Sequence, residues 1–256
     1  MKQEPFSKQE LERYARHLCL PRIGLEGQRK LKQSSVLIVG LGGLGSSLAL
    51  LMATAGIGTI GLLDDDIVKL GNLPRQVLYT HDDINDLKAV AAEKRLRQRN
   101  PEVKLRVYCQ KLVEDNAEKI IRDFDLVLDG TDNLPTRRLI NQTCVHLNKP
   151  YIYGAVDYFD GQVSVFWAGQ SPCLNCLYPR DEKKDPSPNE PLHGVLSTLP
   201  TMVSTIQSTE AIKIITGAGK PLVGRLLIID GLNGEFQDVA IRQDQNCEVC
   251  RKSPHN

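Results

Sequence analysis

The sequence has no marked excess of charge of either sign. Its 256 residues include 32 Lys and Arg and 31 Asp and Glu, which give a formal net charge of +1. A chain so balanced gives no electrostatic reason to expect binding to nucleic acid or to a membrane surface. Apolar residues reach 41% and charged residues 25%, which is typical of a globular protein with a sizeable core.

Long apolar runs are also absent. No stretch of about 18 apolar residues exists, so we expect no transmembrane helix. The first residues, Met1 to Pro5, lack the apolar core of a signal peptide. We therefore expect a cytoplasmic protein, in which the seven cysteines do not form a disulfide framework. No repeat or linker divides the sequence, so we expect one domain over residues 1–256.

The most informative motif is a glycine-rich segment that follows an apolar run. Residues 36–39 lead into Gly40-Leu41-Gly42-Gly43-Leu44-Gly45, and a helical stretch follows over 46–55. In such a turn the first glycines allow close backbone approach, and the last lets the helix pack on the strand. Free N–H groups at the helix start then favour a phosphate. The motif predicts a nucleotide site; a turn used only for packing is the alternative.

Apolar runs alternate with helical stretches along the following sequence. We expect strands at 58–63, 104–108 and 126–129, and helices at about 7–18, 26–32, 85–99, 114–122 and 134–147. This alternation predicts an α/β fold with a mostly parallel sheet and helices on both faces. Later strands are expected at 151–153, 162–167, 225–229 and 236–241, with a long helix over 198–216.

Charged residues follow the predicted strands. Asp64 ends the run 59–63, where an acidic residue suits a ribose hydroxyl, and Asp132 follows the strand 126–129. Arg75 and Lys88 lie between them. Two cations and a free carboxylate suit a triphosphate with Mg²⁺ better than a dinucleotide. Taken singly, the cations are also explained as surface charges and Asp132 as a helix N-cap.

Two Cys-x-x-Cys pairs, Cys173 with Cys176 and Cys247 with Cys250, provide four thiols. Four thiolates are enough for a closed tetrahedral Zn²⁺ site, which would be structural because it leaves no position for water. A redox pair is the alternative. The site would join the C-terminal part of the chain to the Pro-rich segment 171–200, which is expected to be a surface loop or a segment that crosses an active site.

The sequence also contains Arg13-Tyr14-x-Arg16 and Asp129-x-Thr131-Asp132-Asn133. With these motifs, the glycine turn, the charged residues and the cysteine pairs in this order, the sequence resembles the ThiF/MoeB/HesA family, prokaryotic relatives of the ubiquitin-activating E1 enzymes. The resemblance covers residues 9–250. It implies a doubly wound, Rossmann-like sheet extended by antiparallel strands, and a homodimer. It also implies ATP- and Mg²⁺-dependent adenylation of the C-terminal glycine of a MoaD- or ThiS-like sulfur carrier, with release of pyrophosphate, in molybdopterin or thiamine biosynthesis.

The resemblance assigns roles to individual residues. Asp64 would hold the ribose, Lys88 the phosphates and Asp132 the Mg²⁺, while Arg16 would reach ATP in the partner subunit. The implied catalytic residues are Arg16, Arg75, Lys88 and Asp132. The implied nucleotide site comprises Gly40, Gly42, Gly43, Gly45, Asp64, Asp66, Gly71, Asn72, Leu73, Pro74, Arg75, Gln76, Lys88, Asp132 and Asn133. The regions would be partner-reaching helices at 1–33, a nucleotide-binding core at 34–150, and carrier-binding strands at 151–256.

One departure from the family concerns a crossover loop at about 180–193. Several members have a cysteine a few residues before the Gly-Val that opens the last long helix, and alignment on Gly194-Val195 places Glu190 there. We therefore expect the enzyme to stop at the acyl-adenylate. A separate sulfurtransferase would supply the sulfur, since no rhodanese-like extension is expected either.

Two other functions fit parts of the sequence. An NAD-dependent oxidoreductase would use the same glycine turn on the same type of sheet. A non-enzymatic E1-like binding protein would keep the zinc site but is expected to lose a phosphate- or magnesium-binding residue. Arg75, Lys88 and Asp132 are all present, so adenylation is the leading interpretation.

Overall fold

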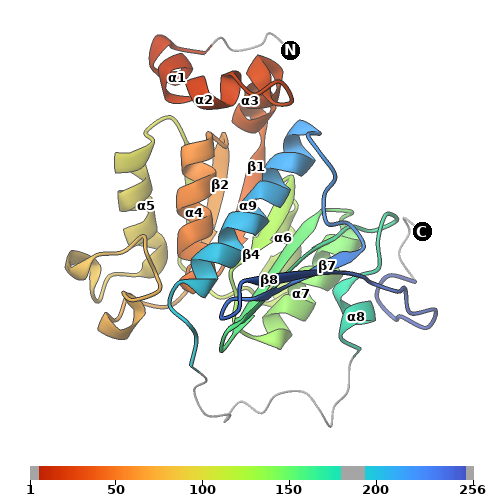
Figure 1. Cartoon of the computed structure of the whole chain (residues 1–256). Helices are drawn as coiled ribbons and strands as arrows, with labels where there is room; N and C mark the ends of the chain where they lie inside the picture. The colour runs from red at the N-terminus through yellow and green to blue at the C-terminus, as the bar shows by residue number, and fades with distance from the viewer. Residues whose placement is uncertain (1–5, 180–193, 252–256) are drawn as a thin grey trace.

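The computed structural model describes residues 6–179 and 194–251, and its strands form one eight-stranded sheet in the order β3-β2-β1-β4-β5-β6-β7-β8 (Figure 1). The parallel part contains β1 (Ser35–Val39), β2 (Thr59–Leu63), β3 (Lys104–Tyr108), β4 (Leu126–Asp129) and β5 (Tyr151–Asp157). The antiparallel extension contains β6 (Asp160–Phe166), β7 (Arg225–Asp230) and β8 (Glu235–Ala240). The predicted fold class is confirmed.

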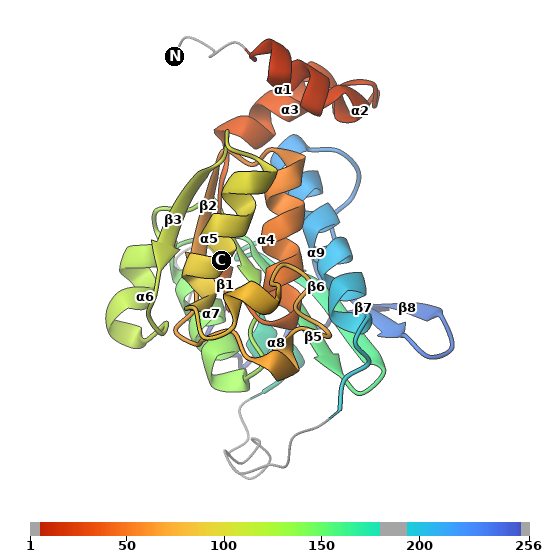
Figure 2. The same ribbon diagram turned by 90° about the vertical axis from the view of Figure 1, so that its left-hand side faces the viewer.

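Helices cover both faces of the sheet, each over its own apolar core (Figures 1 and 2). One face is covered by α4 (Gly43–Ala55), α5 (Lys88–Arg99) and α9 (Leu199–Thr216), the other by α6 (Glu114–Ile121), α7 (Leu134–His146) and α8 (Leu174–Leu177). At one end of the sheet lie α1 (Lys8–Arg13), α2 (Ala15–Leu18) and α3 (Gly24–Gln33). Short 3₁₀ turns, η1 and η2, occupy Leu70–Asn72 and His81–Asp83. Within the described ranges, none of the helices has the length and apolar character that a membrane span needs.

Two predicted helices have other bounds in the structure. The first is broken at Tyr14, whose buried side chain accepts a hydrogen bond from Asn100 Nδ2 at 2.9 Å. The predicted helix 85–99 begins only at Lys88, because Asn85 has the left-handed φ of 76°. The predicted helix end at Gly217 is confirmed, with φ of 79°.

β1 and β4 are neighbours whose following helices, α4 and α7, lie on opposite faces of the sheet. A crevice for ligands forms at such a switch point. The two strand ends approach through glycine backbone. A Cβ on Gly45 would lie 1.8 Å from Gly40 O, and one on Gly130 would lie 2.3 Å from the same oxygen. Side chains are therefore excluded at these positions.

Gly45→Ala tests this contact. We expect it to lower the free energy of unfolding by about 3 kcal/mol or more, since the methyl group meets backbone that cannot turn aside. Gly71→Ala is the control, because nothing lies within 4 Å of its added Cβ. Urea unfolding of both variants gives the measurement. An unchanged midpoint for Gly45→Ala would contradict the packing described.

Candidate functional site

A cavity of about 190 Å³ lies where β1, β2 and β4 end. The glycine turn, the end of β2, the start of α5 and the loop after β4 contribute to its wall. Of the residues expected at the nucleotide site, those that line it are Gly40, Gly42, Asp64, Asp66, Lys88, Asp132 and Asn133. Residues from four separate chain segments thus meet at the switch point of the sheet.

Asp64 fixes the glycine turn as well as facing the cavity. Its Oδ2 accepts the Leu41 N–H at 2.6 Å, and its Oδ1 accepts the Asp66 N–H at 2.8 Å. Burial raises the pKa of Asp64, against these two hydrogen bonds. Each carboxylate oxygen has two acceptor positions. One position on each therefore remains for a ribose hydroxyl.

Lys88 and Asp66 form an ion pair in the cavity wall. Lys88 Nζ lies 2.7 Å from Asp66 Oδ2, and Lys69 Nζ lies 3.0 Å from Oδ1. Burial alone would raise the pKa of Asp66, but the hydrogen bonds from Lys88 and Lys69 outweigh it and hold this pKa at about 2. Asp66 is thus ionised at neutral pH. It offsets the unfavourable position of a cation at the start of α5.

Asp132 is not the N-cap of α7. That cap is Asn133, whose Oδ1 accepts the Thr136 N–H at 3.0 Å. The exposed Asp132 carboxylate receives a hydrogen bond of 3.4 Å from Asn133 Nδ2 and lines the cavity. Carboxylate oxygen is a preferred ligand of Mg²⁺. The donor set therefore suits a divalent cation beside a polyphosphate.

The segment that contains Arg75 and Gln76 packs beside the glycine turn. Arg75 Cγ lies 3.6 Å from the position of a Cβ on Gly43, and the buried Gln76 has Nε2 3.8 Å from that of Gly42. The Arg75 guanidinium donates to Gly71 O at 3.0 Å. Also expected at the site, but not lining the cavity, are Gly43, Gly45, Gly71, Asn72, Leu73, Pro74, Arg75 and Gln76.

Arg16 belongs to α2, and this helix lies at the opposite end of the molecule (Figures 1 and 2). The neighbouring Tyr14 packs where α4 and α5 end, since a Cβ on Gly56 would lie 2.6 Å from its ring. The glycine turn is at the other end of α4, whose 13 residues span about 20 Å. The exposed Arg16 on α2 therefore cannot reach the cavity of its own chain.

Sequence reasoning missed several residues that shape the cavity. Gly130 follows β4 directly, a position that could have indicated close approach. Tyr79 is buried and donates its hydroxyl to Leu41 O at 2.9 Å, and burial raises its pKa. Arg137 contacts the loop after β4 from α7. A single Tyr or Arg in a helical or loop segment gives no pattern that predicts such contacts.

A second hollow, of about 400 Å³, adjoins the first and shares Asp132 with it. Its wall on the side of β5 and β6 includes Tyr153, Gln162 and Tyr178. Both tyrosine hydroxyls donate to Gln162 Oε1, at 3.1 and 2.6 Å. A polar chain that enters along these strands would arrive at Asp132.

The four cysteines of the Cys-x-x-Cys pairs lie together. Cys173 Sγ is 3.6 Å from Cys247 Sγ, Cys176 Sγ is 3.5 Å from Cys250 Sγ, and all four lie within 4.8 Å. A disulfide needs about 2.05 Å, whereas thiolates bound to one zinc ion lie about 3.8 Å apart. Burial, with the neighbouring Cys176 and Cys247, raises the pKa of Cys173 to about 11. The arrangement fits one tetrahedral metal ion, whose binding would displace protons.

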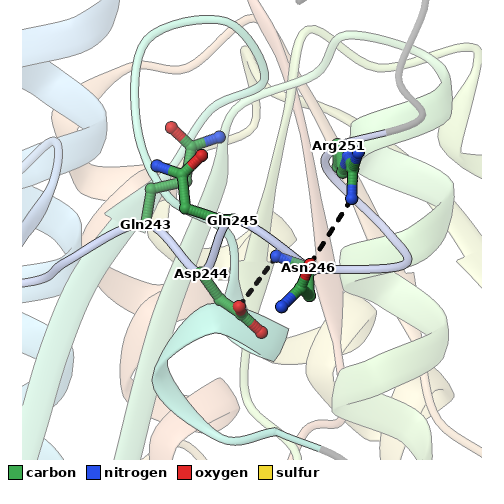
Figure 3. A pocket seen from close by; sticks show the side chains of 5 residues that line it. All are labelled: Gln243, Asp244, Gln245, Asn246 and Arg251. Carbon is green, nitrogen blue, oxygen red and sulfur yellow. Dashed lines mark hydrogen bonds between the residues drawn. The ribbon is translucent and has the colours of Figure 1, made fainter.

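The second cysteine pair is held by a polar turn, five side chains of which are labelled in Figure 3. Cys247 N–H donates to Asp244 O at 3.1 Å, and Arg251 N–H donates to Cys247 O at 3.3 Å. Beside it lies a hollow of about 410 Å³ lined by Gln243, Asp244, Gln245, Asn246 and Arg251. This hollow shares no lining residue with the cavity at the strand ends and is separate from it.

A family model described as "ThiF family" matches residues 14–249. The chain belongs to the ThiF family. The resemblance expected from the motifs is thereby confirmed, over nearly the whole described structure.

Named relatives of this ThiF family chain include adenylyltransferases. A "Sulfur carrier protein adenylyltransferase" of Thermus thermophilus is 42% identical over 254 residues, which are 97% of this chain and 94% of the relative. A "Probable adenylyltransferase/sulfurtransferase MoeZ" of Mycobacterium tuberculosis is 40% identical over 93% of this chain. An "Adenylyltransferase and sulfurtransferase MOCS3" of Drosophila yakuba is 42% identical over 97%. The ThiF family chain spans 62% and 55% of these last two.

Solved structures share the fold of this ThiF family chain. "Crystal structure of E. coli MccB + ATP" superposes with a TM-score of 0.83 at 24% identity, over 95% of this chain and 75% of that one. "Crystal structure of E. coli MccB + MccA-N7isoASN" superposes with a TM-score of 0.84 at 22% identity, over 96% of this chain and 75% of that one. The likeness establishes the fold, and with it the position of the cavity at the strand ends.

Glu190 and the crossover loop lie outside the described residues.

Proposed function

We propose that this chain is an adenylyltransferase that uses ATP and Mg²⁺ to activate the C-terminal glycine of a small ubiquitin-like sulfur carrier. The observation that supports this most is the cavity in which Asp64, Lys88 and Asp132 meet at the switch point of the sheet. The name of the Thermus thermophilus relative supports the substrate class. A nicotinamide cofactor would leave the cation-binding Asp132 without a role.

The chemistry needs charge and positioning rather than a general base. A C-terminal carboxylate has a reference pKa of roughly 3.5 and is already ionised at pH 7. Its oxygen attacks the α-phosphorus, the bond from that phosphorus to pyrophosphate breaks, and an acyl-adenylate forms. Repulsion between carboxylate and triphosphate is the main obstacle, which the cations Lys88 and Arg75 would reduce. Mg²⁺ held by Asp132 would neutralise further phosphate charge.

The second hollow gives the carrier a route to the nucleotide. It leads along β5 and β6 to Asp132, which both hollows share. Its hydrogen-bonding wall suits an extended peptide that ends in Gly-Gly. We infer that the strands of region 151–256 bind the carrier. Both MoaD-like and ThiS-like carriers fit this route, and thus both the molybdopterin and thiamine pathways. A separate sulfurtransferase would then act on the acyl-adenylate, since residues 187–193 contain no cysteine.

We further propose a homodimer that completes each site. Helix α4 contains no charged residue, and the outward positions Met202, Thr205 and Thr209 of the adjacent α9 are uncharged. An uncharged face on two packed helices suits a self-complementary interface. Because Arg16 cannot reach its own cavity, its proposed role on the phosphates requires the partner subunit.

Asp132→Ala tests the chemistry. We expect carrier-dependent exchange of pyrophosphate into ATP to fall by about 100-fold or more, the usual effect of losing electrostatic support in a transition state. The measurement uses purified MoaD-like and ThiS-like carriers, which also identifies the substrate. Asp115→Ala, an exposed change on α6, is the control. Undiminished exchange by Asp132→Ala, or nicotinamide-dependent turnover by the wild type, would refute the proposal.

Mixing two inactive variants tests the composite site. Arg16→Ala and Asp132→Ala are each expected to be inactive alone. Random exchange of subunits makes half of the dimers mixed, with one of two sites intact, so about a quarter of wild-type exchange should return. Activity is measured after subunit exchange, with each variant alone as control. If Arg16→Ala is active alone, or if mixing restores nothing, Arg16 does not act across the dimer.

Zinc content tests the cysteine cluster, which we propose holds one structural Zn²⁺ per chain. Cys176→Ser should lose the ion and unfold at lower temperature, because a structural zinc site contributes folding free energy. Elemental analysis and thermal unfolding give the measurements. Cys19→Ser, an exposed cysteine away from the cluster, should keep the ion. Full zinc content in Cys176→Ser would rule out this ligand set.

A further inference from the structure

The loop that contains Asp132 leaves the sheet where β4 and β5 separate. The two strands pair only through Val127 with Tyr151 and Leu128 with Ile152. Beyond these pairs β5 continues beside β6, while the chain after β4 turns away into Gly130–Asn133. Because the loop has no ladder partner in β5, its peptide groups must find their hydrogen bonds elsewhere.

Arg137 supplies one of these bonds from the first turns of α7. Its Nη2 donates to Thr131 O at 2.7 Å and to Gly154 O on β5 at 3.4 Å. Its guanidinium carbon lies 5.4 Å from the centre of the Tyr153 ring. The Thr131 carbonyl belongs to the same peptide unit as the Asp132 N–H. Arg137 therefore fixes the peptide plane from which Asp132 projects.

Asp129 fixes the other side of Thr131. Its Oδ1 accepts the Thr131 N–H at 2.9 Å and the Thr131 hydroxyl at 2.7 Å. Its Oδ2 accepts the Tyr151 hydroxyl at 2.5 Å and lies 3.6 Å from Arg137 Nε. Both peptide groups that flank Thr131 are thus tied to one cluster, made of Asp129, Tyr151 and Arg137.

Stability alone does not account for this cluster. Asp129 is fully buried, the Arg137 side chain is 14% exposed, and the buried Arg137 Nε makes no hydrogen bond with the described residues. Burying such a pair costs several kcal/mol per ion, and apolar replacements are often as stable. The hydrogen bonds of the cluster instead converge on Thr131, the residue before Asp132. What they provide is a fixed backbone from which one exposed carboxylate projects.

We propose that Arg137 is a positioning residue that, through Thr131, sets the affinity of Asp132 for the divalent cation accompanying the nucleotide. This inference rests on the proposed function, since it takes Asp132 as a metal ligand. Mg²⁺ demands near-ideal octahedral geometry, so a carboxylate free to turn binds it less well. Groups that support a metal ligand typically change metal affinity by about 10- to 100-fold when they are removed.

The test titrates Mn²⁺, a spectroscopic substitute for Mg²⁺, into the full chain with a non-hydrolysable ATP analogue. Loss of the electron paramagnetic resonance signal of free Mn²⁺ gives the dissociation constant without turnover. Arg137→Lys keeps the charge but not the planar fork, and we expect the dissociation constant to rise about 10-fold or more. Tyr151→Phe keeps every contact of Arg137 but removes the hydrogen bond that the Tyr151 hydroxyl donates to Asp129. It should therefore raise the dissociation constant for Mn²⁺ less than Arg137→Lys does.

A matched control separates positioning from stability. Arg95 is 20% exposed and pairs with the fully buried Asp83, away from the Asp132 loop. Arg95→Lys should therefore lower thermal stability comparably while leaving Mn²⁺ affinity unchanged. If Arg137→Lys and Tyr151→Phe lower only thermal stability, as Arg95→Lys does, the inference is wrong.

The titration also separates this inference from the proposed function. If the wild type binds Mn²⁺ with the nucleotide analogue but activates no carrier, the proposed function fails, while the variants still decide the role of Arg137. If the wild type binds no Mn²⁺ with the analogue, both fail. In active enzyme, the Mg²⁺ concentration for half-maximal exchange should rise in Arg137→Lys by the same factor. This is measured at saturating carrier, because Arg137 also lines the second hollow.

Discussion

Backbone contact among Gly40, Gly45 and Gly130 holds together the two halves of the nucleotide cavity. The positions of a Cβ on Gly45 and on Gly130 would lie 1.8 and 2.3 Å from Gly40 O, inside any tolerable contact. Only hydrogen at these positions lets α4 begin directly against the end of β1, beside β4. The free N–H groups at the start of α4 and the Asp132 carboxylate thereby come to one crevice.

This constraint explains which parts could be predicted from the sequence. The glycine turn and the ends of β2 and β4 repeat a local pattern, so the positions of Asp64 and Asp132 could be predicted from their places just after strands of a parallel sheet. The requirement for glycine at position 130 was missed, because the oxygen that Gly130 approaches belongs to Gly40, which is distant in the sequence. The helix break at Tyr14 also depends on a distant residue, because Asn100 Nδ2 donates a hydrogen bond to the Tyr14 hydroxyl. Local patterns predict elements, whereas contacts between elements set their ends.

The pairing of charged residues was the least predictable part of the site. Asp66 and Lys88 lie 22 residues apart, and the sequence indicated only that each faces a nucleotide. The structure pairs them, which orients the ammonium before any ligand arrives. Asp129 was noticed as part of a family motif, but its partners Tyr151 and Arg137 come from β5 and α7. Such pairs become visible only when the fold brings their elements together.

Helix α9 connects these features. Gln207 Nε2 donates to Asp129 O at 2.9 Å and to Ile152 O at 3.2 Å, which bridges the opening between β4 and β5. Three residues earlier, Ser204 donates to Leu44 O at 2.9 Å, in the first turn of α4. One helix thus contacts both halves of the cavity from its inner face. Its outer face at Met202, Thr205 and Thr209 is the uncharged surface that the proposed dimer would cover. In that dimer, the interface that brings Arg16 to the partner's cavity would also contact α9. Because α9 bridges β4 and β5 beside Asp132, subunit association and cation binding would both depend on this helix.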